Sequence, residues 1–147
     1  MSKQEFSNIY FDQVAVGDTL PQLEIEITPT LIVSTAIASR DYQDVHHDRV
    51  RAQELGSPDI FMNILTSNGL VGRYVTDWAG PEAILVSVNI RLGAPNYPGD
   101  TMVMSAEVTA KREEQGRYLV DLAVAGKNKL GVHVSGTVIV DLPNSAA

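Results

Sequence analysis

The side chains best suited to chemistry are concentrated in one short stretch, RDYQDVHHD, which runs from Arg40 to Asp48. Two of the three histidines of the chain lie in it, together with three aspartates. A carboxylate and an imidazole can form an acid–base pair, and the same side chains can bind a metal. Because Asp is also common in solvated turns, three interpretations are open: an acid–base pair, a metal site and a plain loop.

Asp41 and His46 are the two residues of this stretch whose spacing is most informative. Five residues on a helix correspond to a rotation of about 140° around its axis, so these two side chains would not share a helical face. We therefore expect an irregular loop that turns them towards each other. Adjacent residues in an extended segment point in opposite directions, which disfavours a metal site built from His46, His47 and Asp48.

The composition restricts the class of protein. The 147 residues, 44% of them hydrophobic, predict a single domain over residues 1–147 with a core of its own. The absence of cysteine excludes disulfides and thiolate chemistry and fits a cytoplasmic location. The net charge of −7 argues against nucleic-acid binding, and no apolar run is long enough to span a membrane. We expect residues 1–9 and 142–147 to be loose ends.

The hydrophobic pattern predicts five strands and three helical segments. The strands are expected at residues 23–28, 83–92, 101–112, 117–126 and 132–141. Two short helical segments are expected at 31–40 and 49–57, and a longer buried helix is expected to open at Ser57-Pro58-Asp59 and end near Trp78. This order predicts an α+β fold in which a helix lies on or inside an antiparallel sheet.

The third histidine and one pair of basic residues lie outside the polar stretch, and a structural role is predicted for each. The alternation of Val132, Val134, Val138 and Val140 puts His133 on the outward face of the last strand, where it would be exposed. Lys111-Arg112 is the only adjacent basic pair, and a solvated turn is the favoured interpretation for it, with contact to the phosphates of a ligand as the alternative.

Three local motifs give the chain a resemblance to a known family. They are Tyr10-Phe11-Asp12 with Val16-Gly17-Asp18, the segment SRDYQDVH from Ser39 to His46, and Pro98-Gly99-Asp100-Thr101. Together they resemble the MaoC-like, R-specific enoyl-CoA hydratases, which have the hot-dog fold: a curved antiparallel sheet wrapped around one long helix. The segments STAIASRDYQDVHHDR, DIFMNILTSNGLVGRYVTDWAGP and RLGAP look like the small MaoC-like subunits of two-component steroid enoyl-CoA hydratases.

This resemblance implies an activity and a site. The reaction would be the reversible addition of water across the α,β double bond of an enoyl-CoA thioester, with a bulky steroid side chain as the acyl group, in sterol catabolism. The catalytic positions that it carries over are Asp41 and His46, which would activate the water. The N-terminus of the buried helix would hold the thioester oxyanion through the backbone N–H of Asn63, with Gln43 and Met62 near the substrate. We expect no metal, and no cofactor beyond the CoA of the substrate.

The chain also departs from the family pattern. Arg40 stands in place of a glycine, Gln43-Asp44 in place of Asn-Pro, and Met62-Asn63 in place of His-Gly. Gln43 could replace the asparagine in holding the loop, whereas the loss of the glycine puts the oxyanion geometry in question. The resemblance further implies a dimer, or a heterotetramer with a second MaoC-like chain. Two rivals stay open: a dehydratase or thioesterase on the same fold, and a non-catalytic hot-dog partner subunit.

Overall fold

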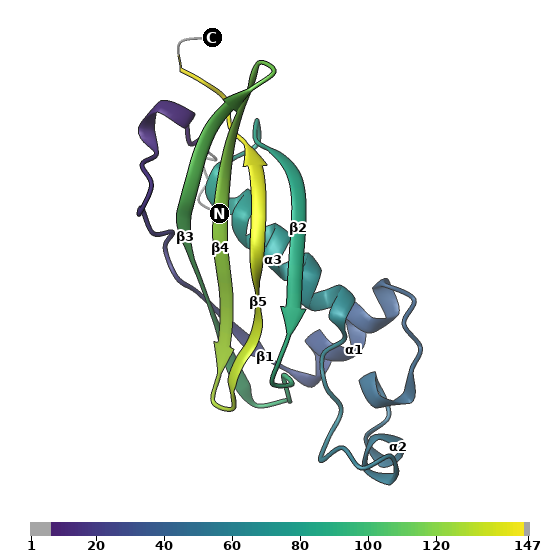
Figure 1. Ribbon diagram of the computed structural model, residues 1–147. Coiled ribbons are helices and arrows are strands. Elements are labelled where there is room, and N and C mark those ends of the chain that lie inside the picture. Colours follow the sequence, from purple (N-terminus) through teal and green to yellow (C-terminus); the bar gives the residue numbers. More distant parts are fainter. Residues whose placement is uncertain (1–6, 146–147) are drawn as a thin grey trace, which may run out of the picture.

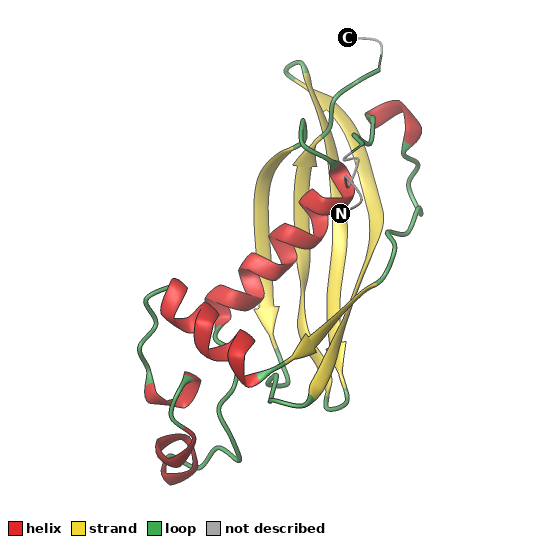
Figure 2. Cartoon of the chain, turned by 180° about the vertical axis from the view of Figure 1, so that it is seen from behind, coloured by secondary structure: helices red, strands yellow, loops and turns green. Residues whose placement is uncertain are grey.

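The chain folds into a curved antiparallel sheet with one long helix lying along its inner face (Figure 1, Figure 2). The structure, a computed structural model, describes residues 7–145. The strands follow the order β1-β3-β4-β5-β2, and each neighbouring pair is antiparallel. Their bounds are β1 (Leu23–Ile27), β2 (Ile84–Leu92), β3 (Asp100–Glu114), β4 (Arg117–Asn128) and β5 (Gly131–Asp141). The predicted α+β, hot-dog fold is confirmed.

The alternation of side chains along the strands builds the core between sheet and helix. In β3, Met102, Met104 and Val108 are fully buried, whereas Thr101 and Glu107 are exposed. The buried face packs against the long helix α3 (Ile64–Ala79), whose apolar residues belong to the same core cluster. The period of two in the sequence therefore corresponds to one packed and one open face of the sheet.

The remaining helices gather at the N-terminal end of α3, beyond the end of the sheet (Figure 2). They are α1 (Pro29–Ala38), the 3₁₀ turn η2 (Asp44–His46) and α2 (Arg49–Glu54), and a further 3₁₀ turn, η1 (Phe11–Gln13), lies near the N-terminus of the chain. Thr28 caps α1, since its hydroxyl accepts the Leu31 N–H at 3.0 Å. Between residues 7 and 145, no helix is long and apolar enough to cross a membrane.

The long helix begins later than the sequence predicts, at Ile64. The expected capping residues are used elsewhere: the Ser57 hydroxyl donates to the Asp59 carbonyl at 2.6 Å, and the Asp59 carboxylate pairs with Arg49 at 2.9 Å. The N-cap is instead Asn63, whose side-chain oxygen accepts the Thr66 N–H at 2.9 Å. The prediction that the helix opens at Ser57-Pro58-Asp59 is therefore wrong by about one and a half turns.

The ends of the described chain are tied to the domain. The Ile9 N–H donates to the Ala79 carbonyl at 3.0 Å, and the Phe11 N–H donates to the Pro143 carbonyl at 2.9 Å. Leu142 is buried. Residues 7–9 and 142–145 thus make specific contacts where we expected loose ends, and the rest of that expectation, for residues 1–6 and 146–147, lies outside the described residues.

Lys111 and Arg112 belong to β3, within the strand expected at residues 101–112, so the solvated turn favoured for this pair is wrong. The Lys111 ammonium donates to the carbonyls of Phe11 and Val14 and lies 4.2 Å from the centre of the Phe11 ring. Arg112 forms an ion pair with Asp121 on β4. Lys111 therefore binds the N-terminal segment to β3, and Arg112 links β3 to β4.

Strands β2 and β5 approach so closely at Gly136 that a side chain does not fit between them. A Cβ there would lie 2.1 Å from the Asn89 carbonyl oxygen and 2.8 Å from the Ile90 Cα. Because both are backbone atoms, we expect Gly136→Ala to lower the free energy of unfolding by about 3 kcal/mol or more, the upper range for single substitutions. Urea denaturation would measure this.

The matched control is Gly69→Ala in α3, where a Cβ would have no atom within 4 Å. Alanine is the better helix former, so this change is expected to raise the free energy of unfolding by about 0.5–1 kcal/mol. Equal effects at the two glycines would show that the close approach of β2 and β5 does not exist in solution.

Candidate active site

The end of α1 determines where Asp41 lies. The Arg40 N–H donates to the Ile37 carbonyl at 3.0 Å, and the Asp41 N–H donates to the Ala36 carbonyl at 2.9 Å. Arg40 has a left-handed φ of 56°. These two bonds around a left-handed residue form a Schellman motif, which reverses the chain and turns Asp41 back towards the helices. A glycine in place of Arg40, as in the family pattern, would suit this backbone.

His46 is fixed by the turn η2 and by Phe61. Its Nδ1 lies 2.6 Å from the Phe61 carbonyl oxygen, and its ring meets the edge of the Phe61 ring with the two centres 5.0 Å apart. The residue is only 5% exposed. Since a carbonyl can only accept a hydrogen bond, Nδ1 carries a proton, and whenever the ring is neutral Nε2 has a free lone pair.

The two predicted side chains converge as the spacing argument required. The distance from His46 Nε2 to Asp41 Oδ2 is 3.5 Å, and the two side chains are 7% and 18% exposed. This distance exceeds that of a normal hydrogen bond, and a neutral Nε2 and a carboxylate oxygen are both acceptors. The arrangement therefore offers two acceptors side by side, which a single donor such as water can bridge.

Asn63 holds the Asp41 carboxylate in this position. Its Nδ2 donates to Asp41 Oδ2 and to the Ser39 hydroxyl, both at 3.0 Å. Its Oδ1 accepts the backbone N–H and the hydroxyl of Thr66, which fixes the orientation of the amide. The sequence prediction gave Asn63 only a backbone role. Its preference for the N-cap position, just before an apolar run, was the signal available for the side chain.

The first turn of α3 presents free backbone donors beside these side chains. Within residues 7–145, the N–H groups of Asn63, Ile64 and Leu65 make no hydrogen bond, as is usual for the start of a helix. They carry the positive end of the helix dipole. The predicted donor, the Asn63 N–H, is therefore free to bind an anionic oxygen, although the helix starts later than expected.

The other predicted site residues lie less close to the pair. Gln43 is exposed, and its backbone N–H, not its side chain, faces Asp41 Oδ1 at 3.4 Å. Met62 is 3% exposed and contacts Asn96 inside the core. Asp48 caps α2 through the Arg51 N–H at 3.0 Å. Across the part of the chain that the structure describes, no three His, Asp or Glu side chains are grouped as a metal site would need.

His133 is buried, so the prediction of an exposed strand histidine is wrong. It is 2% exposed, its Nδ1 lies 2.6 Å from the Ala94 carbonyl oxygen, and its Nε2 lies 2.7 Å from the Ser67 hydroxyl on α3. Burial lowers the pKa of His133 below its usual range, although the hydrogen bond to Ala94 acts in the opposite direction. The neutral ring therefore donates from Nδ1 and accepts the Ser67 hydroxyl proton at Nε2.

A bulge at the start of β5 explains why the predicted alternation of buried and exposed side chains does not hold at His133. Gly126 of β4 pairs with Val134, and Lys127 pairs with Val132, so His133 is an extra residue without a partner. A bulge of this kind breaks the alternation of faces. As a result, His133 and Val134 are both buried, whereas Val132 is exposed.

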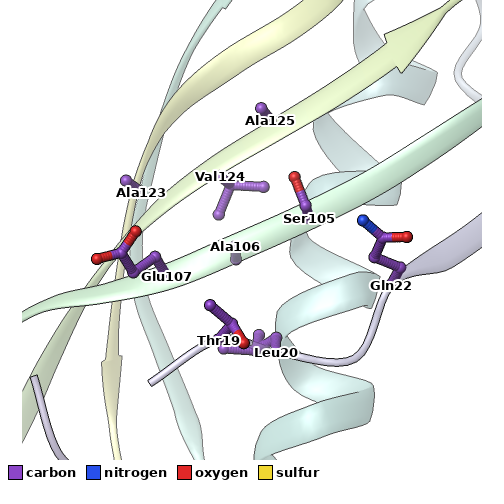
Figure 3. Close-up of a pocket in the computed structure, with 9 residues that line it drawn as sticks. All are labelled: Thr19, Leu20, Gln22, Ser105, Ala106, Glu107, Ala123, Val124 and Ala125. Carbon is purple, nitrogen blue, oxygen red and sulfur yellow. The ribbon is translucent and has the colours of Figure 1, made fainter. Parts of the chain in front are cut away.

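Two of the hollows in the surface differ in whether they adjoin the site. One, of about 350 Å³, runs between α1 and α3 and is lined mainly by apolar atoms; Ser39 and Thr66, which both bind Asn63, form part of its wall. The other, of about 400 Å³, lies between residues 19–22 and strands β3 and β4, and contains none of the polar site residues (Figure 3). The first hollow is therefore the one next to the site, because its wall residues Ser39 and Thr66 bind Asn63, which in turn binds Asp41.

The curved antiparallel sheet wrapped around α3 is the architecture of the hot-dog fold. A solved R-hydratase, PhaJ1 from Pseudomonas aeruginosa, has the same fold, with a TM-score of 0.84 at 23% identity over 94% of this chain and 88% of that one. The sequence model of the MaoC-like domain matches residues 12–127. The chain belongs to the MaoC-like domain family.

One relative is far more similar in sequence. The chain is 53% identical over 130 residues to the 3-oxo-4,17-pregnadiene-20-carboxyl-CoA hydratase beta subunit of Mycobacterium tuberculosis. The aligned residues cover 88% of this chain and 98% of the relative. A chain in the crystal structure of the ChsH1-ChsH2 complex from the same organism has a TM-score of 0.82 and 53% identity, over 87% of this chain and 98% of that one. The similarity thus extends along nearly the whole domain.

Proposed function

We propose that this protein hydrates the α,β double bond of an enoyl-CoA thioester, with Asp41 and His46 as the water-activating pair. The observation that carries the proposal is the 3.5 Å separation of His46 Nε2 and Asp41 Oδ2, two acceptors held in a buried site at the start of α3. A general acid and base within reach of one water are what such an addition requires. The membership of the MaoC-like family supports the same reaction class.

In this proposal the water lies between the two side chains. One water hydrogen points to Asp41 Oδ2 and the other to His46 Nε2, which leaves an oxygen lone pair free to attack the β carbon. As the C–O bond forms and the π bond between the α and β carbons breaks, the pair takes up one proton of the water and delivers a proton to the α carbon, which returns the pair to its starting state. The two groups act as a coupled unit, so the roles of base and acid belong to the pair.

The developing negative charge on the thioester oxygen needs donors, and the first turn of α3 supplies them. The free N–H groups of Asn63, Ile64 and Leu65 lie next to the side chain that holds Asp41. Backbone donors at a helix N-terminus stabilise an anion without reorganisation. In this proposal Asn63 has two functions: its amide side chain orients Asp41, and its backbone N–H faces the oxyanion.

A bulky, apolar acyl group and a second chain complete the proposal. The hydratase subunit from M. tuberculosis is named for a steroid side-chain thioester, and its sequence is 53% identical to this chain. A solved chain of equal identity belongs to a complex of two proteins. By analogy, the substrate is a steroid side-chain enoyl-CoA of sterol catabolism, and the working form is a heteromer with a second hot-dog chain. The apolar hollow beside Ser39 and Thr66 is compatible with a large acyl group.

Hydration of a panel of thioesters tests the proposal. Crotonyl-CoA, a medium-chain enoyl-CoA and 3-oxo-4,17-pregnadiene-20-carboxyl-CoA would be assayed through the loss of the conjugated double bond, with the chain alone and with a candidate partner. We expect turnover of the steroid thioester at a kcat/KM at least about tenfold above that of crotonyl-CoA, as expected when a large apolar group is bound.

Three other results would each contradict a different part of the proposal. Turnover of short thioesters only would retain the hydratase and reject the steroid substrate. Release of free CoA would indicate a thioesterase. If no thioester is hydrated even with the partner, although the partner binds, the chain is a non-catalytic subunit and the proposed function is wrong.

A further inference from the structure

A chain of buried hydrogen bonds links the sheet to the residue that holds Asp41. On the helix side, His133 Nε2 accepts the hydroxyl of Ser67 at 2.7 Å. The Ser67 N–H donates in turn to the Asn63 carbonyl at 3.2 Å. Both His133 and Ser67 are almost fully buried, at 2% and 0% exposure. The first turn of α3 is thus fastened to β5 at the residue that begins the helix.

A second set of bonds reaches the same place from the loop between β2 and β3. His133 Nδ1 donates to the Ala94 carbonyl at 2.6 Å. Two residues further along this loop, the Asn96 carbonyl accepts the Met62 N–H at 3.1 Å. Met62 directly precedes Asn63. His133 therefore contacts both structures that enclose Asn63, the helix on one side and the loop on the other.

We propose that His133, acting through Ser67 and the loop at residues 94–96, is a positioning residue for the Asp41–His46 pair. The inference rests on the proposed hydratase function. Asn63 Nδ2 holds Asp41 Oδ2 at 3.0 Å, so a shift of Asn63 moves the carboxylate relative to His46. A buried polar group whose partners are all satisfied favours one arrangement of the surrounding elements. Packing alone would be served equally well by an apolar side chain at this place.

Three variants separate positioning from packing: Ser67→Ala, His133→Leu and the two combined. Ser67→Ala leaves His133 Nε2 without its partner, whereas His133→Leu removes the bond of the Ser67 hydroxyl and also that of the Ala94 carbonyl; each loss costs stability. The combined change removes both members of the Ser67–His133 bond, so it should recover the stability lost there, although the Ala94 carbonyl still lacks its donor. If His133 positions the site, hydration does not recover with it. We expect kcat to fall about tenfold or more in all three variants, because small misplacements of reacting groups are costly.

The matched control removes a different buried hydrogen bond of the same helix. The Tyr74 hydroxyl donates to the Pro21 carbonyl at 2.8 Å, and Tyr74 lies two turns further along α3, away from Asn63. Tyr74→Phe should lower stability by about 1 kcal/mol, the usual value for one hydrogen bond. Its kcat is expected to stay at the wild-type level.

Two measurements decide the proposal. The first is kcat and KM for the thioester that the wild type hydrates best, with the partner chain present if the wild type requires it. A tenfold loss of kcat that persists in the combined variant, with Tyr74→Phe unaffected, supports positioning. Recovery of kcat along with stability in the combined variant, or an equal loss in Tyr74→Phe, overturns it.

The second measurement does not depend on hydration and so separates this inference from the proposed function. The pH titration of the His46 imidazole is followed by NMR, which is practicable because the chain has only three histidines. A changed His46 titration in Ser67→Ala and His133→Leu, but not in Tyr74→Phe, supports positioning even if the wild type hydrates nothing. Identical His46 titrations in all these proteins overturn it.

Discussion

Asp41→Asn is expected to lower the kcat for enoyl-CoA hydration by at least about 100-fold, the usual lower share of general acid–base catalysis. The replacement keeps the shape of the side chain and removes its charge and basicity. Asn63 Nδ2 donates to the Oδ2 position, so the new amide places its oxygen there and its NH2 group at the Oδ1 position. The contact with Asn63 and the distance to His46 are thereby preserved.

The matched control for this prediction is Asp44→Asn, three residues away in the same stretch. Asp44 is exposed and lies 3.5 Å from Arg51, a surface ion pair that contributes little to stability. Its kcat should equal that of the wild type. Thermal unfolding would show that both variants are folded. A kcat for Asp41→Asn within a few-fold of the control would mean that the carboxylate is not part of the chemistry.

The strands could be predicted from the sequence because they have one packed and one open face. Their predicted and observed bounds differ by one or two residues, and the turns between them carry the expected residues. The prediction failed for the face of His133, since a bulge opposite Gly126 and Lys127 has no signature in a run of alternating valines. Regular periodicity thus predicts the sheet but not a local break in it.

The convergence of Asp41 and His46 could be expected from the sequence, whereas the bonds that produce it could not. The spacing of Asp41 and His46 excluded a shared helical face, and the structure brings them together through the left-handed Arg40 and the turn η2. That arrangement depends on bonds from Phe61 and Asn63, about 15 to 22 residues further along the chain. Local capping rules favoured Ser57 over Asn63. These rules consider only neighbouring residues, and so do not include the hydrogen bond that Asn63 makes to Asp41.

The second large effect is expected at His46, where His46→Asn should also reduce kcat by at least about 100-fold. The amide nitrogen of asparagine can occupy the place of Nδ1 and retain the bond to the Phe61 carbonyl, which His46 makes at 2.6 Å. What is lost is Nε2, the imidazole nitrogen that lies 3.5 Å from Asp41 Oδ2. His46→Ala would add a cavity at a buried site, so a kinetic loss there would be harder to separate from misfolding.

His47→Asn is the control for this change, because His47 is the neighbouring histidine and is exposed. It should leave kcat and the thermal unfolding temperature unchanged. A wild-type kcat in His46→Asn, together with an intact fold, would reduce the role of His46 to packing against Phe61.

Combining Asp41→Asn with His46→Asn tests whether the two side chains act on one water. If they were independent, the two losses would multiply, to about 10,000-fold or more. If one bridging water needs both acceptors, removing the first already abolishes its activation, and the double variant should be only a few-fold slower than either single variant. Multiplying losses would show that the 3.5 Å approach of His46 Nε2 to Asp41 Oδ2 is not a shared site, and that each residue contacts a different atom of the substrate.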